Sequence, residues 1–259
     1  MAQSLLVVAC MDVSLYSAAA AMNATERWQD MVAENLSAAS NPGARQQEIS
    51  FSAVQAGSLS SGTGMPGTDF EIPSAGTTTN FTQGELKPSG NQLDVAAEGP
   101  GFFSVQTPDG ATAYTRDGEF KLNNQGQLTT KQGFPVLGSG GSVRLDPSSS
   151  LPITISAEGE VSQGSESKGK IAVTEFGNMK AVTMGGGGFL YADPDQAQAK
   201  AAVATNVRQG FIEASNTSPT LAMASLITSM RMFETNQKVM QMDSDRMTKE
   251  ITDLSGTGG

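Results

Sequence analysis

The sequence predicts an α+β fold in which helices at both chain ends enclose a mainly antiparallel β region. Residues 11–36 contain neither glycine nor proline, and the residues after Pro219 repeat apolar side chains at alternating steps of three and four. Between these segments, glycine recurs every seven or eight residues from Gly110 to Gly133, each time within a turn dipeptide. The first two patterns are typical of long helices, whereas the third indicates successive β-hairpins.

The N-terminal helix is expected to run from residue 11 to about residue 36. It should stop before Asn41-Pro42-Gly43, because proline cannot continue a helix and glycine accepts left-handed backbone angles. One stripe of this helix is expected to face a partner, since apolar and small residues recur near a three-four spacing at Leu15, Ala18, Met22, Thr25, Val32 and Leu36. Residues 1–10 are expected to be a disordered tail or an extension from a wrongly assigned start.

The middle of the chain divides into a linker and a β domain. Residues 41–80 are rich in serine, glycine and threonine, a composition that predicts an irregular, extended linker. Residues 81–204 are expected to form a β-rich outer domain. In it, short alternating segments such as 113–116 and 119–122 are separated by turn dipeptides such as Asp117-Gly118, which predicts a meander of hairpins.

The C-terminal segment has the most regular apolar pattern in the chain. Ser218 is expected to cap a helix there, with Pro219 in its first turn and Gly256 at its end. The apolar heptad seam, interrupted at Gln237 and Ser244, consists of Met223, Leu226, Met230, Phe233, Met240, Met247, Ile251 and Leu254. A small domain cannot bury so long a seam alone, so the N-terminal helix or neighbouring subunits must cover it. We therefore expect 11–40 and 205–255 to form one helical domain, with the two helices paired as a coiled-coil-like layer.

Composition argues against several classes of function. The formal net charge is −10, from 16 Lys and Arg against 26 Asp and Glu, which disfavours binding to nucleic acid or to anionic membranes. The sequence contains no histidine, which excludes Ser-His-Asp and Cys-His catalysis, and its single cysteine excludes a disulfide within the chain. No apolar run reaches the roughly 20 residues of a membrane-spanning helix. We therefore expect no catalytic residue, no cofactor, no metal ligand and no membrane insertion.

Two hypotheses of function follow from these patterns. Helices with uncovered apolar seams at both ends predict a polymer subunit, because a repeated interface that does not close generates a helical filament. Alternatively, residues 5–10, which end in Cys10, look like a lipoprotein cleavage box, and the chain would be a lipid-anchored β-rich surface binding protein. That stretch lacks the preceding basic residues of a secretory signal, and an anchored protein would leave the heptad helix without a purpose.

Three stretches of the chain resemble one known family. The first, 35–43, reads Asn-Leu-Ser-Ala-Ala-Ser-Asn-Pro-Gly, although Ser37, Ala38 and the following Ala44-Arg45 depart from the family pattern. The second runs from Phe81-Thr82-Gln83-Gly84 to Tyr-Thr-Arg-Asp-Gly at 114–118. The third reads Gln-Gly-Phe-Ile-Glu-Ala-Ser-Asn at 209–216 and precedes the heptad helix. These stretches are similar to flagellar basal-body rod proteins, which form a family of bacterial axial proteins with the hook protein.

The resemblance implies a structural subunit of the flagellar rod, with the terminal helices in an inner layer and the β domain outside. The proximal rod protein is most similar, and a distal rod or hook-type axial protein is the alternative. The implied partners are copies of the chain, other rod and hook-basal-body proteins and the flagellar export apparatus. The rod would then span the periplasm, and its subunits would be exported without a cleaved signal peptide. We expect the assembly interface to contain Leu15, Met22, Val32, Leu36, Leu226, Met230, Phe233, Met240, Met247 and Ile251.

Overall fold

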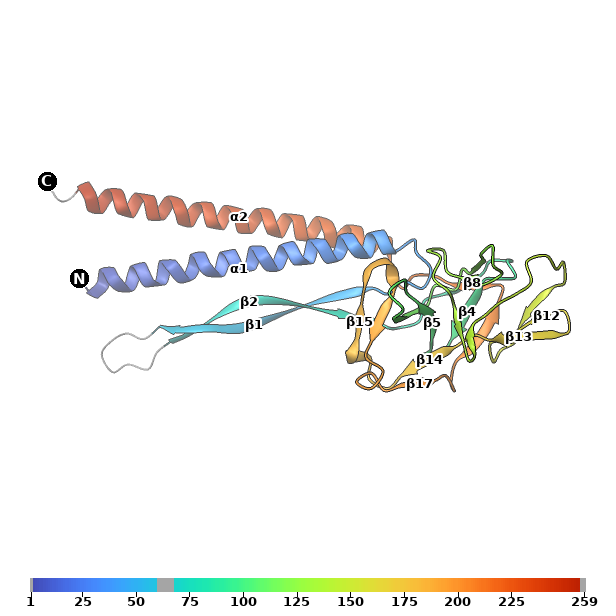
Figure 1. The fold of residues 1–259 in the computed structure, drawn as a ribbon. Helices are drawn as coiled ribbons and strands as arrows, with labels where there is room; N and C mark the ends of the chain where they lie inside the picture. The colour runs from blue at the N-terminus through green and yellow to red at the C-terminus, as the bar shows by residue number, and fades with distance from the viewer. Residues whose placement is uncertain (1, 60–67, 257–259) are drawn as a thin grey trace. The chain divides into compact units, whose positions relative to one another are not determined.

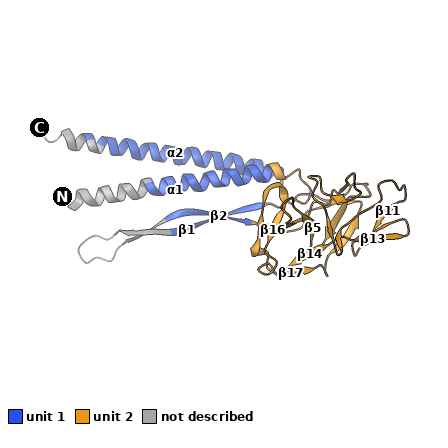
Figure 2. Ribbon diagram, in the orientation of Figure 1, with its two compact units in different colours: residues 1–36, 47–78, 219–259 blue, residues 37–46, 79–218 orange. Residues whose placement is uncertain are grey.

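The computed structural model describes residues 2–59 and 68–256, with side chains described for 16–54, 72–249 and 252. The chain forms two compact units, each built from separate segments (Figure 2). Unit 1 comprises 1–36, 47–78 and 219–259, and unit 2 comprises 37–46 and 79–218. Helices in unit 1 and antiparallel strand pairs in unit 2 confirm the predicted α+β class.

Unit 1 consists of two long helices and a two-stranded sheet (Figure 1). Helix α1 (Ala2–Ala38) and helix α2 (Pro219–Gly256) come from the two ends of the chain, and the sheet consists of β1 (Gln47–Leu59) and β2 (Thr68–Thr79). Within the described part of the chain, neither helix has a stretch long and apolar enough to cross a membrane.

The two helices pack against each other in opposite directions. Met31 and Val32 on α1 share a buried cluster with Ala222 on α2, near the start of that helix. Closer to the other end of the pair, Asn236 Nδ2 donates a hydrogen bond to Thr25 Oγ1 at 3.2 Å. Because the α1 positions decrease as the α2 positions increase, the helices run antiparallel.

Helix α1 also packs against the sheet. Trp28 meets Phe51 of β1 edge-to-face, with ring centroids 5.8 Å apart. At the end of the helix, the buried Asn35 side chain clamps the start of β1 by two hydrogen bonds. Its Nδ2 donates to Gln47 O at 2.7 Å, and its Oδ1 accepts from Gln47 N at 2.8 Å. An amide side chain is needed for this clamp because it must donate and accept at once.

Two expectations about unit 1 were wrong. The irregular linker expected over 41–80 contains both strands of the sheet. A period-two pattern underlies this result, because Ile49 and Phe51 pack toward α1 while Glu48, Ser50 and Ser52 are polar; the high serine and glycine content concealed it. The disordered tail, one of the two alternatives for 1–10, is also wrong, because α1 begins at Ala2 and the apolar run contains no glycine or proline to stop it. The other alternative, an extension from a wrongly assigned start, stays a prediction.

Unit 2 is built mainly on short antiparallel strands. Its largest sheet has six strands in the order β15-β16-β6-β5-β14-β17, and smaller sheets flank it. The strands are β3 (Leu86–Pro88), β4 (Val95–Glu98), β5 (Phe102–Gln106), β6 (Thr112–Thr115), β7 (Lys121–Leu122), β8 (Leu128–Thr129), β9 (Leu137–Gly138), β10 (Gly141–Ser142), β11 (Ile153–Ile155), β12 (Glu160–Gln163), β13 (Glu166–Lys170), β14 (Val173–Phe176), β15 (Val182–Met184), β16 (Leu190–Ala192), β17 (Ala199–Ala201), β18 (Asn206–Gln209) and β19 (Phe211–Glu213). Short 3-10 helices occupy Met179–Ala181 and Gly186–Gly188.

The predicted hairpin turns at Gly110, Gly126 and Gly133 are present, but Asp117-Gly118 lies between β6 and β7, which do not pair with each other. Glycine is needed in the two settings for different reasons. Gly110, Gly126 and Gly133 have φ of 80°, 72° and 88°, a region that side chains with a Cβ rarely occupy. Gly118 lacks a positive φ, but a Cβ there would collide with the backbone oxygen of Val95. The β core beneath these turns is closely packed around fully buried side chains such as Phe103.

The boundary expected before the C-terminal helical domain was also wrong. Residues 205–218 belong to unit 2, because β18 pairs with β4 and β19 pairs with β3. Each of these strands is short, and each finds its partner more than a hundred residues earlier in the chain. Local patterns do not report such distant pairing, so the helix begins only at Pro219.

Candidate functional site: helical assembly faces and a buried ion cluster

The side of α2 that is least exposed follows a regular heptad spacing. Steps of four and three connect Ala222, Leu226, Ser229, Phe233, Asn236, Met240, Asp243 and Met247, all of which are buried or half-buried. Every second member of this set lies one residue before the corresponding residue of the predicted seam, as Ser229 does relative to Met230. Leu226, Phe233, Met240 and Met247 belong to both sets.

Met230 does not occupy the inward position that the sequence pattern assigned to it. Its side chain is 51% exposed, whereas the neighbouring Ser229 is fully buried. Ser229 fits there because its Oγ donates a hydrogen bond to Leu226 O at 2.8 Å, and Asn236 is likewise hydrogen-bonded. A pattern that counts only apolar residues therefore selects Met230. It overlooks the adjacent Ser229, a small polar residue that can be buried because its hydroxyl is hydrogen-bonded within the helix.

The α1 residues of the expected interface lie partly on the inner side of unit 1. Val32 is buried in the cluster with Ala222, and Leu36 packs against that cluster. Met22 is half-buried. Leu15 and Ile251 fall outside the residues with described side chains.

Helix α2 exposes large apolar side chains that nothing else in the described chain covers. Two groups lie away from the inward positions: Met223, Ile227 and Met230 on one side, and Leu221, Met232, Val239 and Met242 farther around the helix. A helix that is apolar on several sides is typically surrounded by other protein. Exposed apolar patches of this kind mark interaction surfaces.

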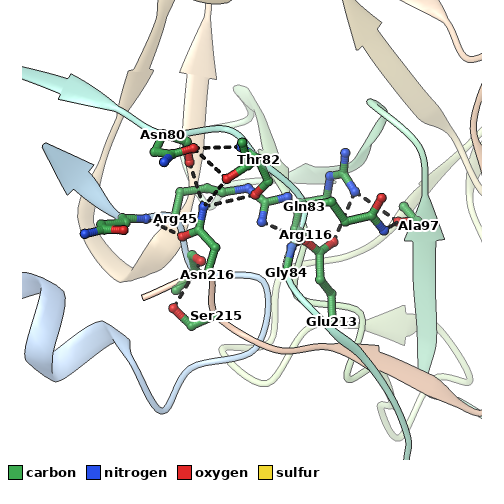
Figure 3. Close-up of polar contacts among 12 residues, drawn as sticks. Arg45, Asn80, Thr82, Gln83, Gly84, Ala97, Arg116, Glu213, Ser215 and Asn216 are labelled. Carbon is green, nitrogen blue, oxygen red and sulfur yellow. Dashed lines mark hydrogen bonds and ion pairs between the residues drawn. The ribbon is translucent and has the colours of Figure 1, made fainter. Parts of the chain in front are cut away.

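A buried ion cluster lies within unit 2 (Figure 3). Glu213, at the end of β19, is fully buried and accepts from three donors. Its Oε1 accepts hydrogen bonds from Arg45 Nη1 at 2.6 Å and from Gly84 N at 2.8 Å. Its Oε2 accepts a hydrogen bond from Arg116 Nη1 at 3.1 Å. Charge-assisted hydrogen bonds of this type are the stronger ones in proteins.

Arg116 has further partners in the same place. It donates to Ala97 O at 3.0 Å and to Gly99 O, and its guanidinium stacks over the Phe102 ring at 4.6 Å. Burial lowers the pKa of Arg116 to about 10, although the neighbouring Glu213 raises it. Two cations thus share one carboxylate. Among the residues that the structure describes, Arg45 Nε, Arg45 Nη2 and Arg116 Nε find no hydrogen-bond partner. The attraction within such a cluster is offset by the cost of removing its charges from water, so the cluster by itself is weak evidence for stability.

Asn216 links three segments of unit 2 beside the ion cluster (Figure 3). Its Oδ1 accepts from Gln46 N at 2.7 Å, and its Nδ2 donates to Asn80 O at 2.9 Å and Thr82 O at 3.0 Å. Together, Asn216 and the ion cluster join residues 44–46, 80–84 and 213–216. These segments end next to the positions where the chain passes between units, at 46/47, 78/79 and 218/219.

The sequence patterns did not predict this cluster, although its residues lie within or beside the three stretches that resemble the family. Arg116 and Glu213 belong to the second and third resembling stretches, and Arg45 was noted as a departure from the family pattern. Arg45 and Glu213 are each the one charged residue of their stretch, 41–47 and 209–216, whereas Arg116 stands beside Asp117 and gave no such signal. Pairing these charges required knowledge that segments 168 residues apart meet, as Arg45 and Glu213 do.

The comparisons with known proteins agree with these features. Residues 96–163 match the model of the flagellar hook protein FlgE/F/G D1 domain, and 208–254 match that of the flagellar basal body rod FlgEFG protein C-terminal region. The flagellar basal-body rod protein FlgF of Mesorhizobium japonicum is 33% identical, covering 94% of this chain and 98% of its own. FlgF of Caulobacter vibrioides is 32% identical, with 89% and 93% covered, and FlgG of Bacillus subtilis is 28% identical, with 93% and 98% covered. The chain therefore belongs to the flagellar basal-body rod protein family and is a structural rod subunit of the flagellum.

Proposed function

We propose that this subunit polymerises into the flagellar rod through the faces of α1 and α2, and that the rod serves as the axial drive shaft between the motor and the hook. The observation that carries this proposal is the uncovered apolar surface of α2, led by Met223, Ile227 and Met230. A monomer gains nothing from exposing these side chains, whereas a polymer buries them between copies. Repeating one heterologous contact without closure produces a helical tube.

The inward positions of unit 1 have a second role in this proposal. Leu226, Phe233, Met240 and Met247 pair with Met22, Val32 and Leu36 in a coiled-coil-like layer, and the outward stripes then join that layer to neighbouring subunits. Leu15 and Ile251 extend the same interface toward the helix ends. Ordering of the helix ends is coupled to docking, because their apolar stripes need partners to fold against.

The remaining assignments rest on family membership. The rod protein assembles with other rod and hook-basal-body proteins at the basal body. We further propose the rod position of the relatives named FlgF, which are 32–34% identical over 89–94% of this chain. The FlgG relatives that cover 90% or more of it are 28–30% identical, and those at 32–33% cover 67%. We propose that this position is the proximal segment of the rod, with the distal segment as the alternative. The proposal also includes delivery by the flagellar export apparatus without a cleaved signal peptide. The role of the chain is structural rather than enzymatic.

Charge substitutions on the two faces of α2 test the assembly mechanism. Phe233→Asp places a carboxylate in the half-buried inward seam, and Met230→Asp places one on the outward stripe. Lys238→Asp, at an exposed position that already carries a charge, is the matched control. A buried unpaired charge costs several kcal/mol, so we expect the first two variants to lose motility while Lys238→Asp retains it. Normal motility with Met230→Asp would contradict the outward interface. Normal motility with Phe233→Asp would contradict the inward seam.

A further inference from the structure

Methionine residues are unusually concentrated on the outward surface of α2. The chain has 13 methionines, and four of them, Met223, Met230, Met232 and Met242, are between 51% and 70% exposed. None of the four occupies an inward position of the helix, and all four lie in the apolar surface assigned to assembly. By contrast, Met31 on α1 is only 7% exposed.

Exposure decides which methionines an oxidant reaches. Hydrogen peroxide transfers one oxygen atom to a thioether sulfur; the sulfur loses two electrons, the O–O bond breaks and water leaves. The product is a sulfoxide, which is polar and chiral where the methionine was apolar and flexible. Two thiols of a methionine sulfoxide reductase reverse the reaction, forming a disulfide and releasing water.

We propose that Met223, Met230, Met232 and Met242 are sites of reversible sulfoxidation that prevents the free subunit from assembling. This inference rests on the proposed function, because it requires the outward surface of α2 to be buried between copies. A sulfoxide oxygen at that interface would be desolvated without a dedicated donor, which opposes association. Once the subunits have assembled, the same contacts exclude the oxidant, so the polymer is protected and the free subunit is the vulnerable form.

The choice of methionine at these positions fits this role. Leucine or isoleucine would supply comparable apolar area, but neither forms a reversible polar product. The oxidised methionines also differ from those of the inward seam, Met240 and Met247, which are half-buried against the rest of unit 1. Loss of assembly can therefore be separated from loss of the helix pair.

The experiment uses the purified full chain, graded hydrogen peroxide and peptide mass spectrometry. In the unassembled protein, we expect sulfoxide to form at the four outward methionines at least about tenfold faster than at Met31. The oxidised subunit should show at least a tenfold higher critical concentration for assembly by sedimentation. Treatment with methionine sulfoxide reductase should restore the original value. Preformed assemblies given the same peroxide should remain unoxidised at the four positions.

A variant carrying Leu in place of all four outward methionines is the matched control. It retains the other nine methionines, so peroxide treatment should leave its critical concentration at the value measured for the same variant before treatment. Equal peroxide sensitivity of this variant and the natural chain would overturn the inference, as would unchanged assembly of a subunit whose four sulfoxides are verified. Failure of the untreated chain to assemble with basal-body proteins would instead contradict the proposed function, and the inference would fall with it.

Discussion

Replacing Glu213 by glutamine tests the electrostatic balance of the buried ion cluster. Glutamine keeps the shape of the side chain but removes the negative charge that contacts Arg45 and Arg116, whose side chains are each 2% exposed. Removing one partner of a buried ion pair costs roughly 3–5 kcal/mol, because the remaining charge stays desolvated. Here two guanidinium groups would stay behind, so we expect the free energy of unfolding of unit 2 to fall by the upper part of that range.

Arg45→Met provides the informative counterpart. It leaves Arg116 and Glu213 as a neutral pair and removes the two Arg45 donors that lack partners. Gly84 N still donates to Glu213 Oε1. We therefore expect Arg45→Met to cost less than about 2 kcal/mol, and we expect it to relieve part of the loss when it is combined with Glu213→Gln.

Urea unfolding with two optical probes measures these effects separately in each unit. The single tryptophan, Trp28, lies in unit 1, whereas near-ultraviolet circular dichroism also reports the packed aromatic residues of unit 2. Glu85→Gln is the control, because Glu85 and Lys87 are both exposed; it should change stability by less than about 0.5 kcal/mol. A loss below about 1 kcal/mol for Glu213→Gln, or an equal loss for Arg45→Met, would refute the charge-balance reasoning.

Three further substitutions test features described above. Asn35→Asp keeps the acceptor for Gln47 N but loses the donor to Gln47 O, so we expect a loss of about 1–3 kcal/mol by urea unfolding, with an Asn35→Gln variant testing side-chain reach. Burial raises the pKa of Asp117 to about 6, so the folded chain holds this proton more tightly than the unfolded chain does. The resulting contribution to stability is present at about pH 4 and is lost as the pH rises through about 6. Asp117→Asn should remove that decline from a series of urea midpoints measured at different pH values. Gly118→Ala should lower the melting temperature because its Cβ collides with Val95, whereas Gly140→Ala, with open space around it, should not; equal effects of the two would contradict the collision.

Local patterns predicted the elements that are long or that depend on one turn. The apolar spacing of α2 predicted its extent because its heptad pattern continues over many turns, and Gly110, Gly126 and Gly133 marked hairpins because their positive φ favours glycine. Features that depend on distant segments were missed. The pairing of β18 with β4 and the meeting of Arg45 with Glu213 join residues more than a hundred positions apart, and no local pattern encodes them.

The exposed position of Met230 has a different origin. Helix α2 is apolar on several sides, so periodicity identified a helix with partners but could not distinguish the partner within the chain from partners outside it. The inward stripe contains Ser229 and Asn236, whose polar groups find hydrogen bonds, and the outward stripe contains methionines. The sequence therefore predicted the helix itself more reliably than which side of it faces α1.

The helix pair of unit 1 imposes a delay on the newly made chain. Thr25 and Asn236, which are hydrogen-bonded across the pair, are separated by 211 residues. At about 5–20 residues per second, a ribosome that has added Thr25 needs about 10–40 s to reach Asn236. During that interval the apolar stripe of α1 has no α2 to pack against, while most strands of unit 2 are already available to one another. The order of synthesis thus favours completion of the β unit first and leaves the amino-terminal helix exposed to any binding protein that acts on the nascent chain.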